Sequence, residues 1–188
     1  MLKELTYMKA PKDLEALHLS GASSLVEIKD MFFEDLKKLQ ILDLSETNIK
    51  KLPSLLNLCK LRQLLLSHCS SSEKLPQLNN LKRLEVLDLS GCSALTVIQD
   101  TSFDQIDSLL SLSSLSNLRR LLLNKFINLK ELPPLGSLTK LEELNLCSVK
   151  FFGETRADFL EHTGHLQILD LSETLLKKLP SSVKAQGS

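Results

Sequence analysis

Seven leucine-containing units recur along this chain, and their spacing limits the folds that it can adopt. Each unit reads Leu-x-x-Leu-x-Leu and is followed, three residues after its last leucine, by Ala, Thr, Cys, Phe or Val. Successive units are offset by 25, 22, 23, 34, 23 and 25 residues. Such a period predicts a solenoid, in which each coil packs against its neighbours. The units start at Leu14, Leu39, Leu61, Leu84, Leu118, Leu141 and Leu166.

The end of each unit has the alternation of a strand with one buried face. In the fourth unit, Leu87 and Leu89 are predicted to point inward, whereas Val86 and Asp88 point outward. We therefore expect residues 1–188 to form one α/β leucine-rich-repeat domain, a curved horseshoe with a parallel sheet on its concave face and short helices and loops on its convex face. Strands are expected near residues 14–19, 39–44, 61–66, 84–89, 118–123, 141–146 and 166–171.

The segments that return from one strand to the next show some helix signals. Asp30 is a candidate cap for a helix over residues 31–38, and Ser102-Phe-Asp-Gln105 matches a capping box. The offset of 34 residues indicates an insertion around residues 107–117. This insertion is expected to form a longer convex helix or loop, with a docking element as the alternative.

The residue that follows each unit is expected to lie where the coil turns. Thr47 keeps a hydroxyl group there, and Cys69 and Cys92 keep a weak S–H donor, whereas Phe126 and Val149 offer no donor. We therefore expect irregular turns in the fifth and sixth repeats. A disulfide between Cys69 and Cys92 is geometrically possible, but two buried free thiols are favoured, because the sparse cysteines and the absence of Asn-x-Ser/Thr sites indicate a reducing compartment.

Composition and motif content argue against several classes of function. The 23 basic and 23 acidic side chains cancel, which disfavours nonspecific binding of nucleic acid. The sequence contains neither a membrane-spanning apolar run nor a signal-peptide core, and a cytoplasmic location is expected. It has no phosphate-binding loop or nucleophile elbow, and His68 beside Cys69 should point away from it. We therefore expect no enzyme activity, cofactor or metal.

The chain begins and ends within the repeat pattern. Residues 1–5 resemble the tail of a repeat, as in residues 128–132, and the seventh unit closes without a polar cap. Solenoids need caps, so the chain is interpreted as a fragment without them, and its open ends are expected to promote self-association.

The stretches LDLSETNIKKLP (42–53) and LDLSGCSALTVI (87–98) combine Leu-x-x-Leu-x-Leu with Thr or Cys and, in the first stretch, with Leu-Pro. This combination resembles the repeat region of plant intracellular nucleotide-binding leucine-rich-repeat immune receptors. The Leu-x-Gly-x-Ile-Pro signature of extracellular plant receptors is missing. The resemblance implies a preceding nucleotide-binding switch module, which this chain does not contain, and repeats that sense pathogen effectors or guarded host proteins and restrain that switch.

The implied function is protein recognition and autoinhibition in plant innate immunity. The expected partner is a pathogen effector, a guarded host protein or, in a longer chain, an intramolecular nucleotide-binding domain. Two alternatives remain open: a free-standing signalling scaffold and the substrate-binding half of a ubiquitin-ligase adaptor. The sequence that flanks position 1 would discriminate, since a nucleotide-binding module, an F-box or a start codon each favours a different reading.

Candidate partner-binding residues occupy the second, third and fifth positions of the units or lie at the rim beside them. These three positions should form the concave face of the sheet. Because acidic and basic repeats alternate, the face suits a protein of mixed charge better than a nucleic acid, which would require a continuous basic stripe. The fold is expected to give the basic members no structural role. The candidates are Arg62, Gln63, Leu65, Glu85, Val86, Asp88, Arg119, Arg120, Leu122, Lys125, Glu142 and Glu143.

Overall fold

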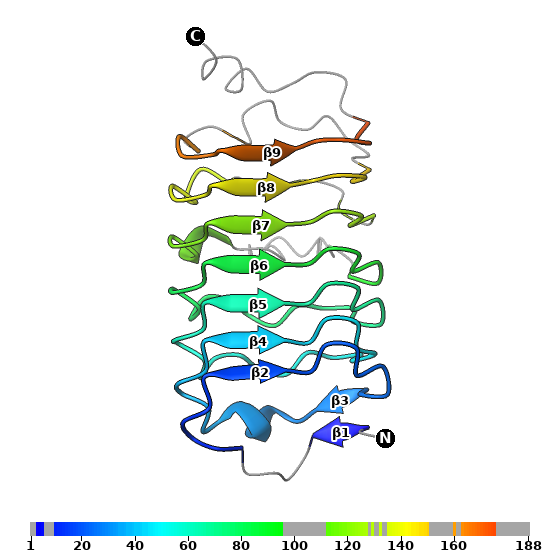
Figure 1. The fold of residues 1–188 in the computed structure, drawn as a ribbon, viewed down its shortest axis with the longest axis vertical. Helices are drawn as coiled ribbons and strands as arrows, with labels where there is room; N and C mark the ends of the chain where they lie inside the picture. The colour runs from blue at the N-terminus through cyan, green and yellow to red at the C-terminus, as the bar shows by residue number, and fades with distance from the viewer. Residues whose placement is uncertain are drawn as a thin grey trace, which may run out of the picture.

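Seven short parallel strands, stacked in sequence order, form the main sheet (Figure 1). The computed structural model describes residues 3–5, 10–95, 112–127, 129, 132, 135–150, 160 and 163–175. Each strand lies within the range that the leucine spacing predicts, and the leucine-rich-repeat solenoid is confirmed. The strands are β2 (Ala16–His18), β4 (Ile41–Asp43), β5 (Gln63–Leu65), β6 (Val86–Asp88), β7 (Arg120–Leu122), β8 (Glu143–Asn145) and β9 (Ile168–Asp170).

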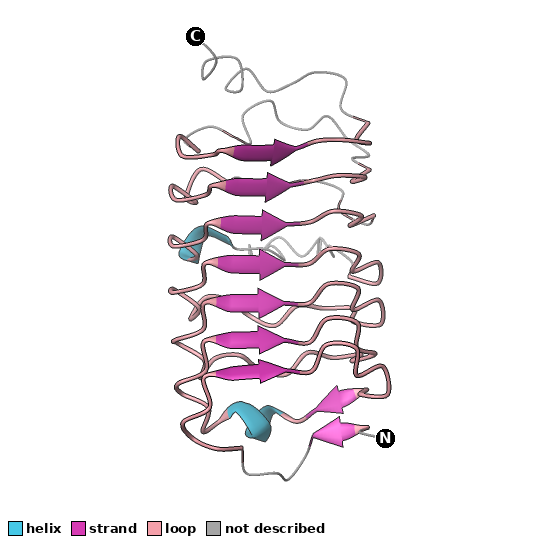
Figure 2. Ribbon diagram, in the orientation of Figure 1, coloured by secondary structure: helices cyan, strands magenta, loops and turns pink. Residues whose placement is uncertain are grey.

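The strand register follows the repeat pattern throughout this sheet. Leu87 pairs with Leu64 on one side and with Leu121 on the other, although 34 residues separate Leu87 from Leu121. The sheet register is therefore continuous across this longer offset. Residues 107–111 of the predicted insertion lie outside the described residues, as does the capping-box sequence of residues 102–105. The 3₁₀ helix η2 (Leu112–Ser114) follows them and leads toward β7 (Figure 2).

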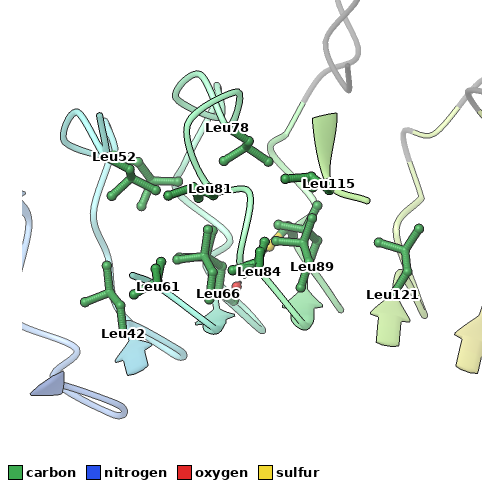
Figure 3. Close-up of a cluster of buried hydrophobic side chains, with 14 of the residues drawn as sticks. Leu42, Leu52, Leu61, Leu66, Leu78, Leu81, Leu84, Leu89, Leu115 and Leu121 are labelled. Carbon is green, nitrogen blue, oxygen red and sulfur yellow. Dashed lines mark hydrogen bonds between the residues drawn. The ribbon is translucent and has the colours of Figure 1, made fainter. Parts of the chain in front are cut away.

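Leucines from successive coils fill the interior between the strands and the return segments (Figure 3). Leu87 and Leu89 are completely buried, whereas Val86 and Asp88 are half-buried on the outer face of the sheet. The predicted inward and outward orientations are therefore confirmed for this strand. A fully buried leucine contributes about 2 kcal/mol of burial free energy relative to its exposed state, so a continuous leucine column holds neighbouring coils together.

The coil turns after each strand are regular in all seven repeats. In each one, a residue with φ between 57° and 73° follows the strand by three positions. In the fifth and sixth repeats these residues are Lys125 and Ser148, and their N–H groups donate to Cys147 and Ser172 of the next coil at 2.8 and 2.9 Å. The prediction of irregular turns there is wrong. Backbone pairing with the next coil fixes the turn, so a polar side chain at positions 126 and 149 is unnecessary.

The return segments contain a second, smaller ladder. Strand β1 (Glu4–Leu5) pairs in parallel with β3 (Glu27–Ile28), so residues 4–5 occupy the place of a repeat tail, as the sequence similarity suggested. The ladder continues with longer hydrogen bonds of 3.4 Å, from Lys50 N–H to Val26 O and from Glu73 N–H to Lys50 O.

The expected helix over residues 31–38 is largely absent. Only the 3₁₀ helix η1 (Asp30–Phe33) forms, and its N-cap residue, Lys29, makes no capping side-chain hydrogen bond. Asp30 Oδ1 instead accepts a hydrogen bond of 2.6 Å from Ser54 N–H in the next repeat. The carboxylate therefore links two coils, which explains why it does not cap its own helix.

Candidate protein-binding face

The candidate binding residues lie on the outer face of strands β5 to β8 and beside it, a surface called the strand face below. Arg62, Arg119 and Arg120 are exposed, and the other candidates apart from Lys125 are half-buried. Lys125 is exposed too, but it belongs to the turn after β7 and not to the strand. Strands β5 to β8 lie side by side in the sheet (Figure 1). Outward side chains from four successive repeats therefore share one face of the sheet.

Each strand-face arginine forms an ion pair with a glutamate of the next repeat. Arg62 Nη1 lies 3.4 Å from Glu85 Oε1. Arg119 donates to Glu142 Oε1 from Nη2 at 2.6 Å and from Nε at 3.0 Å. These partners are 23 residues apart, which is the offset between their repeats, so the strand register places them side by side.

The same relationship holds one position further along β7 and β8. Arg120 Nε donates to Glu143 Oε2 at 2.5 Å. The expectation that Arg119 and Arg120 have no structural role is therefore wrong, since both make contacts between repeats. Exposed pairs of this kind contribute little to stability, typically ~0.2–1 kcal/mol, so their charges stay accessible to a partner.

The hydrogen bond from Arg119 affects the ionisation of its partner. It lowers the pKa of the Glu142 carboxyl below its ordinary value of 4.5, with a smaller contribution from the positive charge itself. In turn, the pKa of Arg119 is raised, chiefly by the same hydrogen bond. The pair is therefore fully charged at neutral pH.

A hollow of about 340 Å³ opens beside this pair. Arg119, Glu85 and Glu142 were predicted from the sequence, whereas the other lining residues were not. Lys140 Nζ donates to Asn117 Oδ1 at 2.7 Å, and Asn117 Nδ2 donates to the Lys82 carbonyl at 2.8 Å. Asn117 comes two positions before Arg119, and Lys140 comes two positions before Glu142. The repeat register could therefore have identified both. The hollow is lined by Glu85, Asn117, Arg119, Lys140, Glu142 and His165.

Asp88 has a structural role in addition to its place on the strand face. Its Oδ1 accepts a hydrogen bond of 2.9 Å from Ser90 N–H, two residues later, and thereby supports the turn after β6. Asp43 and Asp170 make the equivalent bonds after β4 and β9. The side chain of Leu65 or Leu122, at the same position in other repeats, offers no such acceptor, so these residues contribute apolar surface instead.

The thiols of the two buried cysteines form hydrogen bonds between neighbouring repeats in the interior. Cys69 Sγ donates to the Leu44 carbonyl and Cys92 Sγ to the Leu66 carbonyl, each at 3.0 Å and each in the preceding repeat. Both thiols are free, as predicted. Burial raises the pKa of Cys69, and it raises that of Cys92 to about 12. Neither is therefore a ready nucleophile, because the thiolate is the reactive form.

Within the part of the chain that the structure describes, no group of His, Cys, Asp and Glu side chains could hold a metal ion. The same residues include no helix of sufficient length and apolar character to cross a membrane.

Comparison with known proteins supports the repeat class. Residues 12–70 match the leucine-rich-repeat family model. The disease resistance protein At4g19050 of Arabidopsis thaliana is 36% identical over 203 aligned positions, which cover 89% of this chain and 17% of that protein. A second Arabidopsis disease resistance protein, At5g45510, is 41% identical over 69 positions, or 36% of this chain and 6% of that protein. The chain thus spans a small part of the length of these relatives.

Solved structures show the same fold at lower sequence identity. A TDR receptor matches 92% of this chain with 29% of its own length, at a TM-score of 0.64 and 20% identity. The leucine-rich-repeat domain of the type III effector XopL matches 90% of this chain with 68% of its own length, at a TM-score of 0.58 and 23% identity. The chain therefore belongs to the leucine-rich-repeat family, and its repeats are similar to the repeat region of a plant disease resistance protein.

Proposed function

We propose that the strand face recognises a protein partner in plant innate immunity, namely a pathogen effector, a guarded host protein or an adjoining nucleotide-binding domain that the repeats restrain. The resistance-protein relatives support a role in defence. The four free cysteines are compatible with action in the reducing cytoplasm. In this proposal the repeats recognise a partner and carry out no chemistry.

The observation that carries this proposal is the ordered charge pattern across β7 and β8. Arg119 and Arg120 are consecutive residues at the start of β7, and they pair with Glu142 and Glu143 at the start of β8 in the next repeat. The arginine side chains keep about half of their surface exposed. Such a pattern favours a partner whose own charges have the complementary order, and complementarity of this kind governs the rate and selectivity of association.

Charge reversal with a compensating swap tests the proposal. The variant Arg119→Glu/Arg120→Glu places four carboxylates together, so it should lose partner binding and also some stability. Adding Glu142→Arg/Glu143→Arg restores the internal pairs but inverts the pattern that a partner meets. This fourfold variant should recover the wild-type melting temperature and still fail to bind.

The experiment uses the full-length gene product expressed in plant tissue, with affinity capture of partners, cell death as the sign of released autoinhibition, and thermal melts of the purified protein. Lys37→Glu/Lys60→Glu provides the control, because both lysines are exposed and neither forms an ion pair with a described residue. Recovery of both stability and wild-type behaviour in the fourfold variant would show that the four charges act within the fold alone.

A further inference from the structure

A second hollow lies away from the strand face, among the return segments of the first three repeats. Its volume is about 610 Å³. Residues 50–56 of one repeat and residues 73–77 of the next form most of its wall, beside the small ladder that begins with β1 and β3. The lining residues are Asp30, Lys50, Lys51, Leu52, Ser54, Leu56, Glu73, Lys74, Leu75, Pro76 and Gln77.

Three of the lining residues, Lys50, Lys51 and Lys74, are exposed cations. None of them forms an ion pair with a described residue. This distinguishes them from the arginines of the strand face, each of which has a glutamate partner. Their positive charge is therefore available to an anionic group from outside.

The two carboxylates in the hollow cancel only part of this charge. Asp30 already accepts a hydrogen bond from Ser54 N–H and is thereby engaged in joining two repeats. Glu73 is exposed and forms no ion pair with a described residue. Three lysines against two carboxylates leave the hollow with a positive charge.

Apolar side chains supply most of the remaining lining, beside Ser54 and Gln77. Leu52 is buried, Leu75 and Pro76 are half-buried, and Leu56 has 45% of its surface exposed, which makes it one of the most exposed large apolar residues in the described part of the chain. An apolar surface next to unpaired cations suits a ligand that is both acidic and apolar.

We propose that this hollow is a second docking site, which binds an acidic peptide segment of a protein partner through an apolar side chain placed against Leu56 and carboxylates placed near Lys50, Lys51 and Lys74. The site is independent of the strand face. A strand-face variant that loses its own partner should keep this binding unchanged, so the two proposals can fail separately.

The probe is a short fluorescein-labelled peptide in which two leucines are flanked by glutamates, and fluorescence anisotropy measures its binding to the 188-residue chain. Two further peptides carry lysines in place of the glutamates or serines in place of the leucines. The acidic leucine peptide should bind more tightly than both. Binding should weaken in ~1 M salt, where the Debye length is about 3 Å.

Two variants with matched controls locate the binding. Lys50→Glu/Lys51→Glu/Lys74→Glu should weaken the acidic peptide by about tenfold or more, as expected for three reversed exposed charges. Its control, Lys37→Glu/Lys82→Glu/Lys150→Glu, should bind like wild type. Leu56→Ser should also weaken binding, whereas Ile127→Ser, at an equally exposed residue (44%), should not.

Several results would overturn the proposal. They are equal binding of the acidic and basic peptides, retention of affinity by the serine peptide, and equal effects of the hollow variants and their controls. Because all substituted lysines, Leu56 and Ile127 are exposed, thermal melts should show wild-type folding in every variant.

Discussion

The imidazole of His68 lies against Gly91 of the next repeat and occupies the space that a side chain at position 91 would need. A Cβ built on Gly91 would lie 2.5 Å from His68 Nδ1. Gly91 also has a φ of 67°, in the left-handed region. Five equivalent turns accept other residues at positive φ, among them His68 itself. The close approach of His68 therefore adds a second reason for glycine at position 91.

Substitution of Gly91 should be more costly than substitution of Gly21. Gly21→Ala places a side chain in open space at a φ of 73°, so it should cost about 1 kcal/mol from the backbone alone. Gly91→Ala has a similar backbone cost and must also displace the imidazole of His68. Urea denaturation measures both changes. The excess should disappear when the comparison is repeated in a His68→Ala background, and equal losses in the wild-type background would contradict the proposed contact.

Leu87 should be among the costliest positions to truncate. It is completely buried, with coils on both sides, so Leu87→Ala should lower the free energy of unfolding by about 2–5 kcal/mol. Leu17 occupies the same column in β2 but is half-buried, so Leu17→Ala should cost less. Chemical denaturation of the two variants provides the comparison. A Leu87→Ala protein as stable as wild type would be incompatible with the strand register described here.

The four cysteines should differ strongly in reactivity. Cys59 is exposed, whereas Cys69 and Cys92 are buried and their pKa values are raised, that of Cys92 to about 12. At pH 8 a thiol-specific disulfide reagent should therefore modify Cys59 rapidly and reach the two buried thiols only after unfolding. A Cys59→Ser variant should lose the fast phase. Rapid modification of Cys92 in the folded protein would show that the fourth coil is more open than the structure indicates.

The leucine spacing was sufficient to predict the solenoid, because each strand register depends on the position of inward leucines such as Leu64, Leu87 and Leu121. The turns were mispredicted because their conformation depends on backbone bonds to the next coil, and residue 126 or 149 need not contribute a polar group. The helix cap expected at Asp30 was mispredicted because that carboxylate instead accepts a hydrogen bond from Ser54 N–H of the next repeat.

The candidate site was predicted in outline but its internal pairing was missed. Arg62 and Glu85 are separated by the repeat offset, as are Arg119 and Glu142, so combining the offset with the list of outward residues would have identified both pairs. The hollow at Lys50 and Lys74 had no comparable signal. Its lysines matter because they form no ion pair with a described residue, and that can be seen only when the coils are placed in space.

The Arg119–Glu142 pair should make a pH-dependent contribution to stability. The folded pKa of Glu142 is lowered from 4.5, first by the hydrogen bond from Arg119 and, after an opposing effect of burial, by the Arg119 charge. A group whose pKa is lowered by folding stabilises the fold above its unfolded pKa, and this contribution is lost as the pH falls through the folded pKa. Wild type should therefore be more stable than Arg119→Gln at neutral pH, and the difference should vanish in acid.

Carboxyl NMR titration provides the direct measurement. In Arg119→Gln the titration of Glu142 should move upward toward 4.5, because the principal donor is removed. Arg62→Gln is the matched control, since Arg62 pairs with Glu85 and its loss should leave the titration of Glu142 in place. An unchanged Glu142 titration in Arg119→Gln would show that the two side chains do not hold this contact in solution. High salt should reduce the shift in wild type, because both side chains are exposed enough for ions to screen them.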